Sequence, residues 1–152
     1  MSERNRLDVL VPSDADYAAY DGMHCSVVWR NTSNTWRCPG CGRTKREIMR
    51  YGKRGGSNVR VYGPIGWLGG LHRHCDLNED CKRDLRFSET LMCDQCSIAS
   101  AIAKRRLGLP KCWSYSPDEI KKFVRLRPHK SKIEIDLQVA KTIFETETGK
   151  TT

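Results

Sequence analysis

Two Cys-x-x-Cys pairs constrain the fold of this chain more than any other feature. The first pair is Cys38 and Cys41, and the second is Cys93 and Cys96. Four thiolates suffice to close a tetrahedral zinc site, and a site closed by four protein ligands is structural. A redox role needs only one such pair in a βαβ setting, and the sequence shows no βαβ pattern. We therefore expect a structural zinc ion that holds these two segments of the chain together.

Composition agrees with a small core that depends on such a metal. The chain has 152 residues, of which 38% are hydrophobic, and its mean hydropathy is -0.62. This length suits one domain with a modest core, which a metal would strengthen. No apolar run approaches the roughly 20 residues that cross a membrane, and the N-terminus resembles no secretory signal. We expect no membrane association and a cytoplasmic location, where thiols stay reduced.

Basic residues are concentrated in two stretches of the chain. The formal net charge is +9; residues 43–60 contain seven basic side chains and residues 104–132 contain ten. Such clusters favour a polyanion through phosphate contacts and counterion release, although a solvated surface is the simpler alternative. The charge pattern alone indicates a nucleic acid partner and a solvated surface about equally. The candidate phosphate contacts are Arg43, Lys45, Arg46, Arg50, Lys53, Arg54, Arg73, Lys104, Arg105 and Arg106.

Local patterns in the N-terminal half predict short elements. Ser13 and Asp16 have the spacing of a capping box, so a short helix should follow and end near Gly22. Residues 26–30 and 59–62 read as strands, and residues 44–51 as a short basic helix. Residues 63–70 contain too much Gly and Pro for a regular element.

The C-terminal half predicts a strand–strand–helix unit followed by further helices. Residues 71–75 and 85–91 read as strands joined by a polar loop, and residues 98–107 as a helix ending at Gly108. Ser116, Pro117 and Glu119 have the spacing of a helix start. Asp136 should cap a last helix, after a strand-like lead-in over residues 133–135. The expected fold class is α+β: a zinc-stapled ββα core with additional C-terminal helices.

These patterns divide the chain into three segments. Residues 1–35 form an N-terminal helix/strand extension. Residues 36–108 form the zinc-bound ββα core, with a basic insertion at residues 42–70. Residues 109–152 form a C-terminal helical extension.

The layout of residues 36–107 resembles a known family. The first Cys pair is followed by a linker, by Leu71-His72-Arg73-His74-Cys75-Asp76, by a polar loop, by a returning strand, and by Leu-x-Cys-x-x-Cys before a helix. This order is similar to that of the HNH, or His-Me finger (ββα-metal), nucleases, and most similar to the phage recombination endonuclease VII group. The resemblance implies a DNA endonuclease in a bacterial or phage-infected cell that hydrolyses phosphodiester bonds.

The resemblance also implies a catalytic divalent ion, Mg or Mn, in addition to structural zinc. By position, His74 takes the place of the ion's ligand, Cys75 that of the general base His, and Ser97 that of a second ligand, usually Asn. The chain departs from the family pattern at Cys75 and Ser97, because a thiol is a poor substitute for imidazole as a base. In a register shifted by one residue, His74 is the base and Asp76 or His72 lies near the metal.

Three hypotheses follow from these departures. The chain is an active metal-dependent endonuclease, or a degenerate member that binds DNA or a protein partner without cleaving, or a zinc-ribbon-like interaction module. A second metal site is also open, built from His72, His74, Cys75 and Cys81, or with His24 and Cys25, and Cys112 is a further thiol outside the two pairs. The apolar residues of the C-terminal helices could serve a homodimer interface or pack within one chain.

Overall fold

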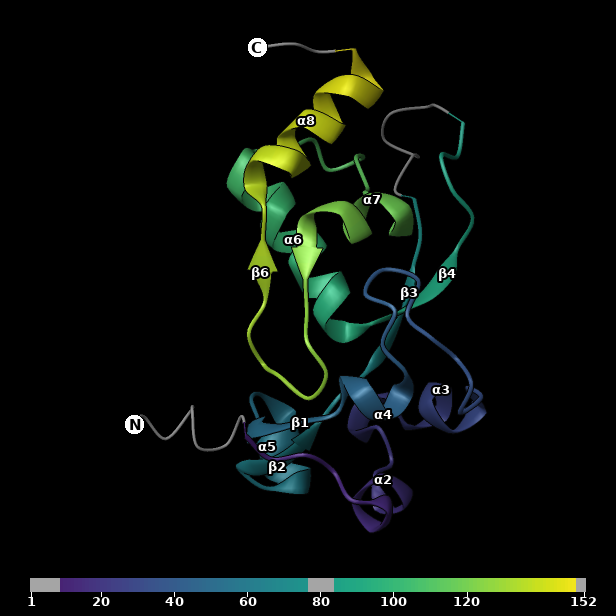
Figure 1. The fold of residues 1–152 in the computed structure, drawn as a ribbon, viewed down its shortest axis with the longest axis vertical. Coiled ribbons are helices and arrows are strands. Elements are labelled where there is room, and N and C mark those ends of the chain that lie inside the picture. Colours follow the sequence, from purple (N-terminus) through teal and green to yellow (C-terminus); the bar gives the residue numbers. More distant parts are fainter. Residues whose placement is uncertain (1–8, 77–83, 150–152) are drawn as a thin grey trace. The chain divides into compact units, whose positions relative to one another are not determined.

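The computed structural model describes residues 9–76 and 84–149 as a mixed α+β protein with short antiparallel sheets (Figure 1). Its elements are, in chain order, α2 (Asp14–Ala19), the 3-10 helix η1 (Met23–Cys25), α3 (Ser26–Asn31), α4 (Lys45–Ile48), β1 (Arg50–Lys53), α5 (Ser57–Tyr62), β2 (Ile65–Leu68), β3 (Leu71–His74), β4 (Thr90–Cys93), α6 (Asp94–Leu107), α7 (Pro117–Phe123), β5 (Val124–Arg125), β6 (Glu134–Ile135) and α8 (Leu137–Thr148). No described helix has both the length and the apolar character needed to span a bilayer.

The chain separates into two compact units that cut across the three predicted segments. Unit 1 contains Met1–Cys38, Gly42–His72 and Leu126–Lys132; unit 2 contains Pro39–Cys41, Arg73–Arg125 and Ile133–Thr152. The predicted core of residues 36–108 is therefore shared between the units, with one boundary inside β3.

Unit 1 is built around the β1–β2 hairpin and short helices. Gly52 pairs with Gly66 in this antiparallel hairpin, and Tyr51 pairs with Trp67. Trp29, Ile48 and Met49 are fully or almost fully buried in the unit. The return segment Leu126–Lys132 is tied to α4 and its C-terminal end, because the His129 backbone N–H donates to the Glu47 carbonyl and its ring Nδ1 donates to the Met49 carbonyl.

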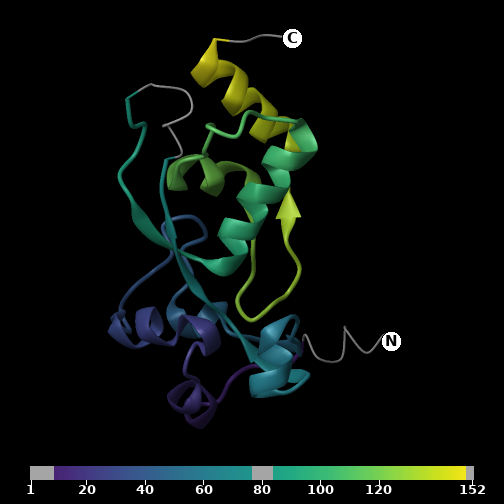
Figure 2. The ribbon, with the colours of Figure 1, turned by 180° about the vertical axis from the view of Figure 1, so that it is seen from behind.

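Unit 2 is mainly helical, and α6, α7 and α8 pack together in both views (Figures 1 and 2). Tyr115 is completely buried, and its hydroxyl donates to the Ala140 carbonyl of α8 at 2.8 Å. The rings of Trp113 and Phe144 meet edge to face at 5.0 Å. β5 and β6 form a short antiparallel pair in which Val124 faces Ile135.

Helix caps are the local features that the sequence predicts best. Capping boxes form at Ser13–Asp16 before α2 and at Ser116–Glu119 before α7. Asp136 accepts from the Val139 N–H at the start of α8, and Gly108 ends α6 in the left-handed region. The short strand β6 confirms the strand-like lead-in to α8. β3, β4 and α6 follow one another as strand, strand and helix, and the two strands form one sheet.

Several strand and loop predictions are wrong. Residues 26–30 lie in the helix α3, and residues 59–62 lie in the helix α5, although their β-branched residues favour strands. A glycine with positive φ precedes each segment: Gly22 is the N-cap of η1, which leads into α3, and Gly56 is the N-cap of α5. Tertiary context overrides side-chain preference in both segments. The segment 1–35 therefore contains no strand among its described residues, 9–35.

The other differences concern element boundaries. Residues 65–68, predicted to be irregular, form β2, where the small Gly66 leaves room for the Arg54 guanidinium. The helix expected over residues 44–51 ends at Ile48, because residues 50–53 pair with β2. The returning strand covers only Thr90–Cys93, and α6 begins at Asp94 rather than residue 98 because the Cys93 sulfur caps it. Most of the predicted polar loop lies outside the described residues.

Candidate metal centres and candidate catalytic histidine

The four cysteines of the two pairs form one cluster. Their sulfur atoms all lie within 4.8 Å of one another, and Cys38, Cys93 and Cys96 are buried. The sulfur atoms of Cys41 and Cys93 are 3.7 Å apart. A tetrahedral zinc ion with Zn–S bonds of about 2.3 Å requires sulfur–sulfur distances of about 3.8 Å. The cluster can therefore hold a structural metal ion such as zinc, as the spacing predicts.

The first pair lies on a tight turn. The Cys38 N–H donates to the Arg43 carbonyl at 2.9 Å, and the Gly42 N–H donates to the Cys38 carbonyl at 2.7 Å. Gly42 has φ +77°, a conformation that glycine adopts without cost. At Gly40 a side chain would meet the Cys96 sulfur at 2.9 Å, so only glycine allows this approach.

The second pair lies at the start of α6. Cys93 is the N-cap of the helix, and its sulfur accepts the Cys96 N–H at 3.3 Å. N–H donors and the positive end of a helix both stabilise thiolates, the form of cysteine that binds metal. The local fold therefore prepares both cysteines of this pair as ligands.

His74, the last residue of β3, has a fixed ring orientation. Its Nε2 lies 2.6 Å from the Tyr115 carbonyl, and its half-buried ring stacks on Phe87 at a centroid distance of 5.3 Å. A carbonyl can only accept, so in the neutral ring Nε2 carries the proton and Nδ1 carries the lone pair. A ring held in this way presents one defined nitrogen as a proton acceptor.

The other residues of the expected catalytic set have different surroundings. Asp76 is only 6% exposed, and its Oδ2 accepts the Arg86 backbone N–H at 2.8 Å. Cys75 is exposed, and Ser97 is half-buried in the first turns of α6. Among the described His, Cys, Asp and Glu side chains, the groups able to hold a metal are the four-cysteine cluster and a second group of His24, Cys25 and His72. His74 and Asp76 belong to neither group, so the expected Mg or Mn site stays a prediction.

Sequence reasoning missed Arg86, which organises the surroundings of His74. Its Nη1 donates to the Ser114 carbonyl at 2.7 Å, and its Nη2 forms an ion pair with Glu119 of α7. The guanidinium carbon lies 4.0 Å from the centre of the Trp113 ring. Arg86 therefore fixes the segment that carries the Tyr115 carbonyl. No local motif marks this role, because its partners are far away in the sequence.

Several predicted phosphate contacts are buried and serve the fold. Arg43, Lys45 and Arg50 are at most 9% exposed. Arg43 donates to the Arg127 carbonyl, and Lys45 donates to the carbonyls of Trp29 and Thr32. The prediction that these three side chains contact DNA is corrected, because a buried cation cannot reach a phosphate.

Arg54 and Arg46 are also held by neighbouring groups. Arg54 donates to the carbonyls of Tyr62, Ile65 and Trp67, so its guanidinium supports the β1–β2 hairpin. Arg46 forms an ion pair with Asp14 and donates to the Pro12 carbonyl.

The remaining basic candidates lie at the surface or near it. Arg73 has a side chain that is 79% exposed, with a loose ion pair to Glu89 at 3.9 Å. Lys53, Arg105 and Arg106 are exposed, whereas Lys104 is half-buried and donates to the Lys111 carbonyl at 3.3 Å. Burial lowers the pKa of Lys104, and nearby Asp76 opposes this effect.

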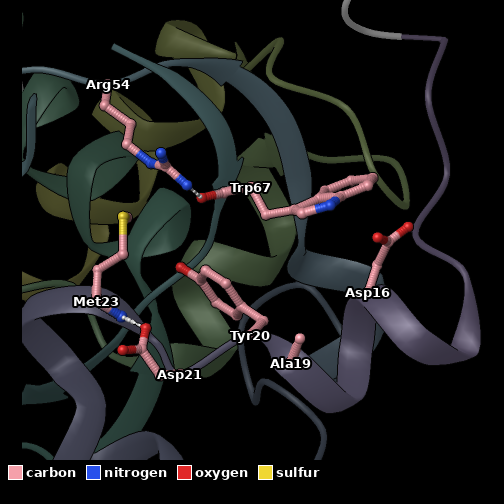
Figure 3. A pocket seen from close by; sticks show the side chains of 7 residues that line it. All are labelled: Asp16, Ala19, Tyr20, Asp21, Met23, Arg54 and Trp67. Carbon is pink, nitrogen blue, oxygen red and sulfur yellow. Dashed lines mark hydrogen bonds between the residues drawn. The ribbon is translucent and has the colours of Figure 1, made fainter. Parts of the chain in front are cut away.

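A shallow pocket of about 210 Å³ lies within unit 1 (Figure 3). It is lined by Asp16, Ala19, Tyr20, Asp21, Met23, Arg54 and Trp67. The Trp67 ring packs edge to face against Tyr51 at 5.1 Å, and the Trp67 carbonyl accepts from Arg54. Trp67 therefore packs on the hairpin, and the pocket offers no grouping of reactive side chains.

Comparisons of the chain with protein-family models, with curated proteins and with solved structures gave no match.

Proposed function

We propose that this chain is an HNH-like DNA endonuclease, in which a zinc ion on Cys38, Cys41, Cys93 and Cys96 stabilises a ββα unit and His74 is the general base. The orientation of His74 is the observation that carries the proposal. Its Nε2 donates to the Tyr115 carbonyl, so the lone pair on Nδ1 can take a proton from water that attacks a phosphate.

The surroundings of His74 support this role. Phe87 stacks on the ring, and Arg86 fixes the segment that contains Tyr115 through the Ser114 carbonyl. A general base needs such a fixed position, because proton transfer requires hydrogen-bond geometry. Of the two alignments with the family, these contacts favour the one in which His74, and not Cys75, is the base.

DNA would be held by the exposed basic side chains. In unit 2, Arg73 follows His72 on β3, and Arg105 and Arg106 lie in the last turn of α6. Exposed cations of this kind bind phosphates by displacing counterions. A bound divalent ion, Mg or Mn, would stabilise charge on the scissile phosphate. The proposal assigns that ion no ligands, since His74 belongs to neither metal-binding group of His, Cys, Asp and Glu side chains among the described residues.

Nicking of supercoiled plasmid in the presence of Mg²⁺ or Mn²⁺ tests the proposal. We expect His74→Ala and His74→Gln to reduce the nicking rate by about 100-fold or more, the usual contribution of a general base. Gln is the sharper variant, because its amide can still donate to the Tyr115 carbonyl but cannot accept a proton. Cys75→Ser should keep the wild-type rate. Loss of activity in Cys75→Ser with retention in His74→Gln would reverse the assignment.

A second candidate function is DNA binding without cleavage. It is favoured by the absence of His74 and Asp76 from the metal-binding groups of the described residues, and by the departures at Cys75 and Ser97. In that case wild-type protein leaves plasmid intact with either metal, while its affinity for duplex DNA still falls steeply with salt. Failure of both cleavage and salt-dependent binding would leave the protein-partner hypothesis.

A further inference from the structure

We propose that His24, Cys25 and His72 form a second zinc site, distinct from the four-cysteine cluster and with one open coordination position. One ligand atom from each of these residues lies within 4.8 Å of the others. His24 and Cys25 lie on η1, and His72 lies on β3. All three residues belong to unit 1.

An unusual backbone turn presents the two neighbouring ligands. Gly22 has φ +82°, and Met23 has φ +52°, a conformation that residues with side chains rarely adopt. The turn is held in place because Met23 is 4% exposed and its N–H donates to the Asp21 carboxylate at 2.8 Å. Strained backbone that the surroundings enforce is frequent at ligand sites.

Asn58 of α5 provides an outer contact for His24. Its amide nitrogen lies 3.4 Å from the His24 Nδ1. Rotation of the Asn58 side-chain amide by a half-turn places its oxygen beside the His24 Nδ1. The Nδ1–H then donates to this oxygen, and the His24 Nε2 presents a lone pair. Imidazoles that bind metals commonly donate their other N–H to an oxygen in this way.

The donor set identifies the metal. Two neutral imidazoles and one thiolate suit zinc, a cation of borderline softness that prefers tetrahedral N and S ligands. Cys25 is 8% exposed, whereas His24 is exposed and His72 is half-buried, so the histidine side of the site faces solvent. Three protein ligands leave the fourth position to water, as in catalytic zinc sites, whereas the four-cysteine cluster is closed.

Zinc stoichiometry of the full chain tests the site, with the protein prepared without a histidine tag. We expect two zinc ions per chain by native mass spectrometry and by elemental analysis, and one ion in His24→Ala and in His72→Ala. Because His24 is exposed, its substitution should leave the fold intact, which circular dichroism would verify. Cys75→Ser is the matched control, since this exposed thiol lies outside both groups, and it should keep two ions.

A single zinc ion in the wild-type protein would overturn the proposal, as would two ions in His24→Ala. The count does not depend on cleavage or on DNA binding. The second site and the proposed function can therefore fail independently.

Discussion

At the scale of single residues, Gly22 shows how one missing side chain shapes a functional segment. Its φ of +82° starts the turn that leads into His24 and Cys25. A Cβ at this position would lie 2.5 Å from the Trp29 Cβ, and Trp29 is buried. Neither the backbone nor the packing therefore tolerates a substitution.

We predict that Gly22→Ala destabilises the protein by about 2 kcal/mol or more, because backbone strain and a steric clash act together. Urea unfolding measures the change. Gly55→Ala is the matched control, since Gly55 lies in open space and is outside the left-handed region. Equal stability of the two variants would mean that the turn at Gly22 is not formed as described.

The roles of individual basic residues could not be predicted from the sequence. The sequence shows that residues 43–54 are rich in Arg and Lys, and this density indicates a polyanion. It does not show that Arg43 and Lys45 donate to backbone carbonyls far away in the chain. A buried and an exposed cation have the same local pattern, and only tertiary contacts distinguish them.

At the scale of elements, Lys45 of α4 caps the C-terminal end of α3. Its ammonium donates to the Trp29 carbonyl at 2.7 Å and to the Thr32 carbonyl at 3.0 Å. It also lies 4.8 Å from the centre of the Trp29 ring. A cation at this end of a helix satisfies carbonyls that lack partners and complements the helix dipole.

We predict that Lys45→Met destabilises the protein by about 1–3 kcal/mol at neutral pH, because the two carbonyls lose their donor while the apolar stem is retained. Lys53→Met is the control, since Lys53 is exposed.

Burial lowers the pKa of Lys45, so the unfolded chain binds more protons there than the folded protein does. The stability of wild type relative to Lys45→Met should therefore rise with pH between the folded pKa and about 10.4. Urea unfolding across this alkaline range measures the stability difference between wild type and Lys45→Met. A fall in this difference with rising pH would contradict the account.

Helix starts were predictable and short strands were not. Ser13, Ser116 and Asp136 cap helices through bonds to residues three positions away, so the signal is local. By contrast, β2 exists because Gly66 faces Gly52 across the hairpin, and α3 forms despite consecutive valines. These outcomes depend on partners that a sequence pattern does not identify.

At the scale of the whole molecule, the two Cys-x-x-Cys pairs predicted the four-cysteine cluster because their spacing is itself the signal. The second group was harder to predict, since His24 and Cys25 meet His72 only through tertiary structure. The sequence left this combination as one of several. The orientation of His74 by the Tyr115 carbonyl could not be predicted, because Tyr115 belongs to a segment with no recognisable motif.

A zinc ion on the four-cysteine cluster would support both the fold and the proposed chemistry, and X-ray absorption at the zinc edge tests for it most directly. The sample is the His24→Ala, His72→Ala double variant, in which only this centre should retain metal. We predict one zinc ion per chain, surrounded by four sulfur atoms at about 2.3 Å and by no nitrogen or oxygen. A zinc-free protein, or a zinc ion with mixed nitrogen and sulfur ligands, would contradict the account.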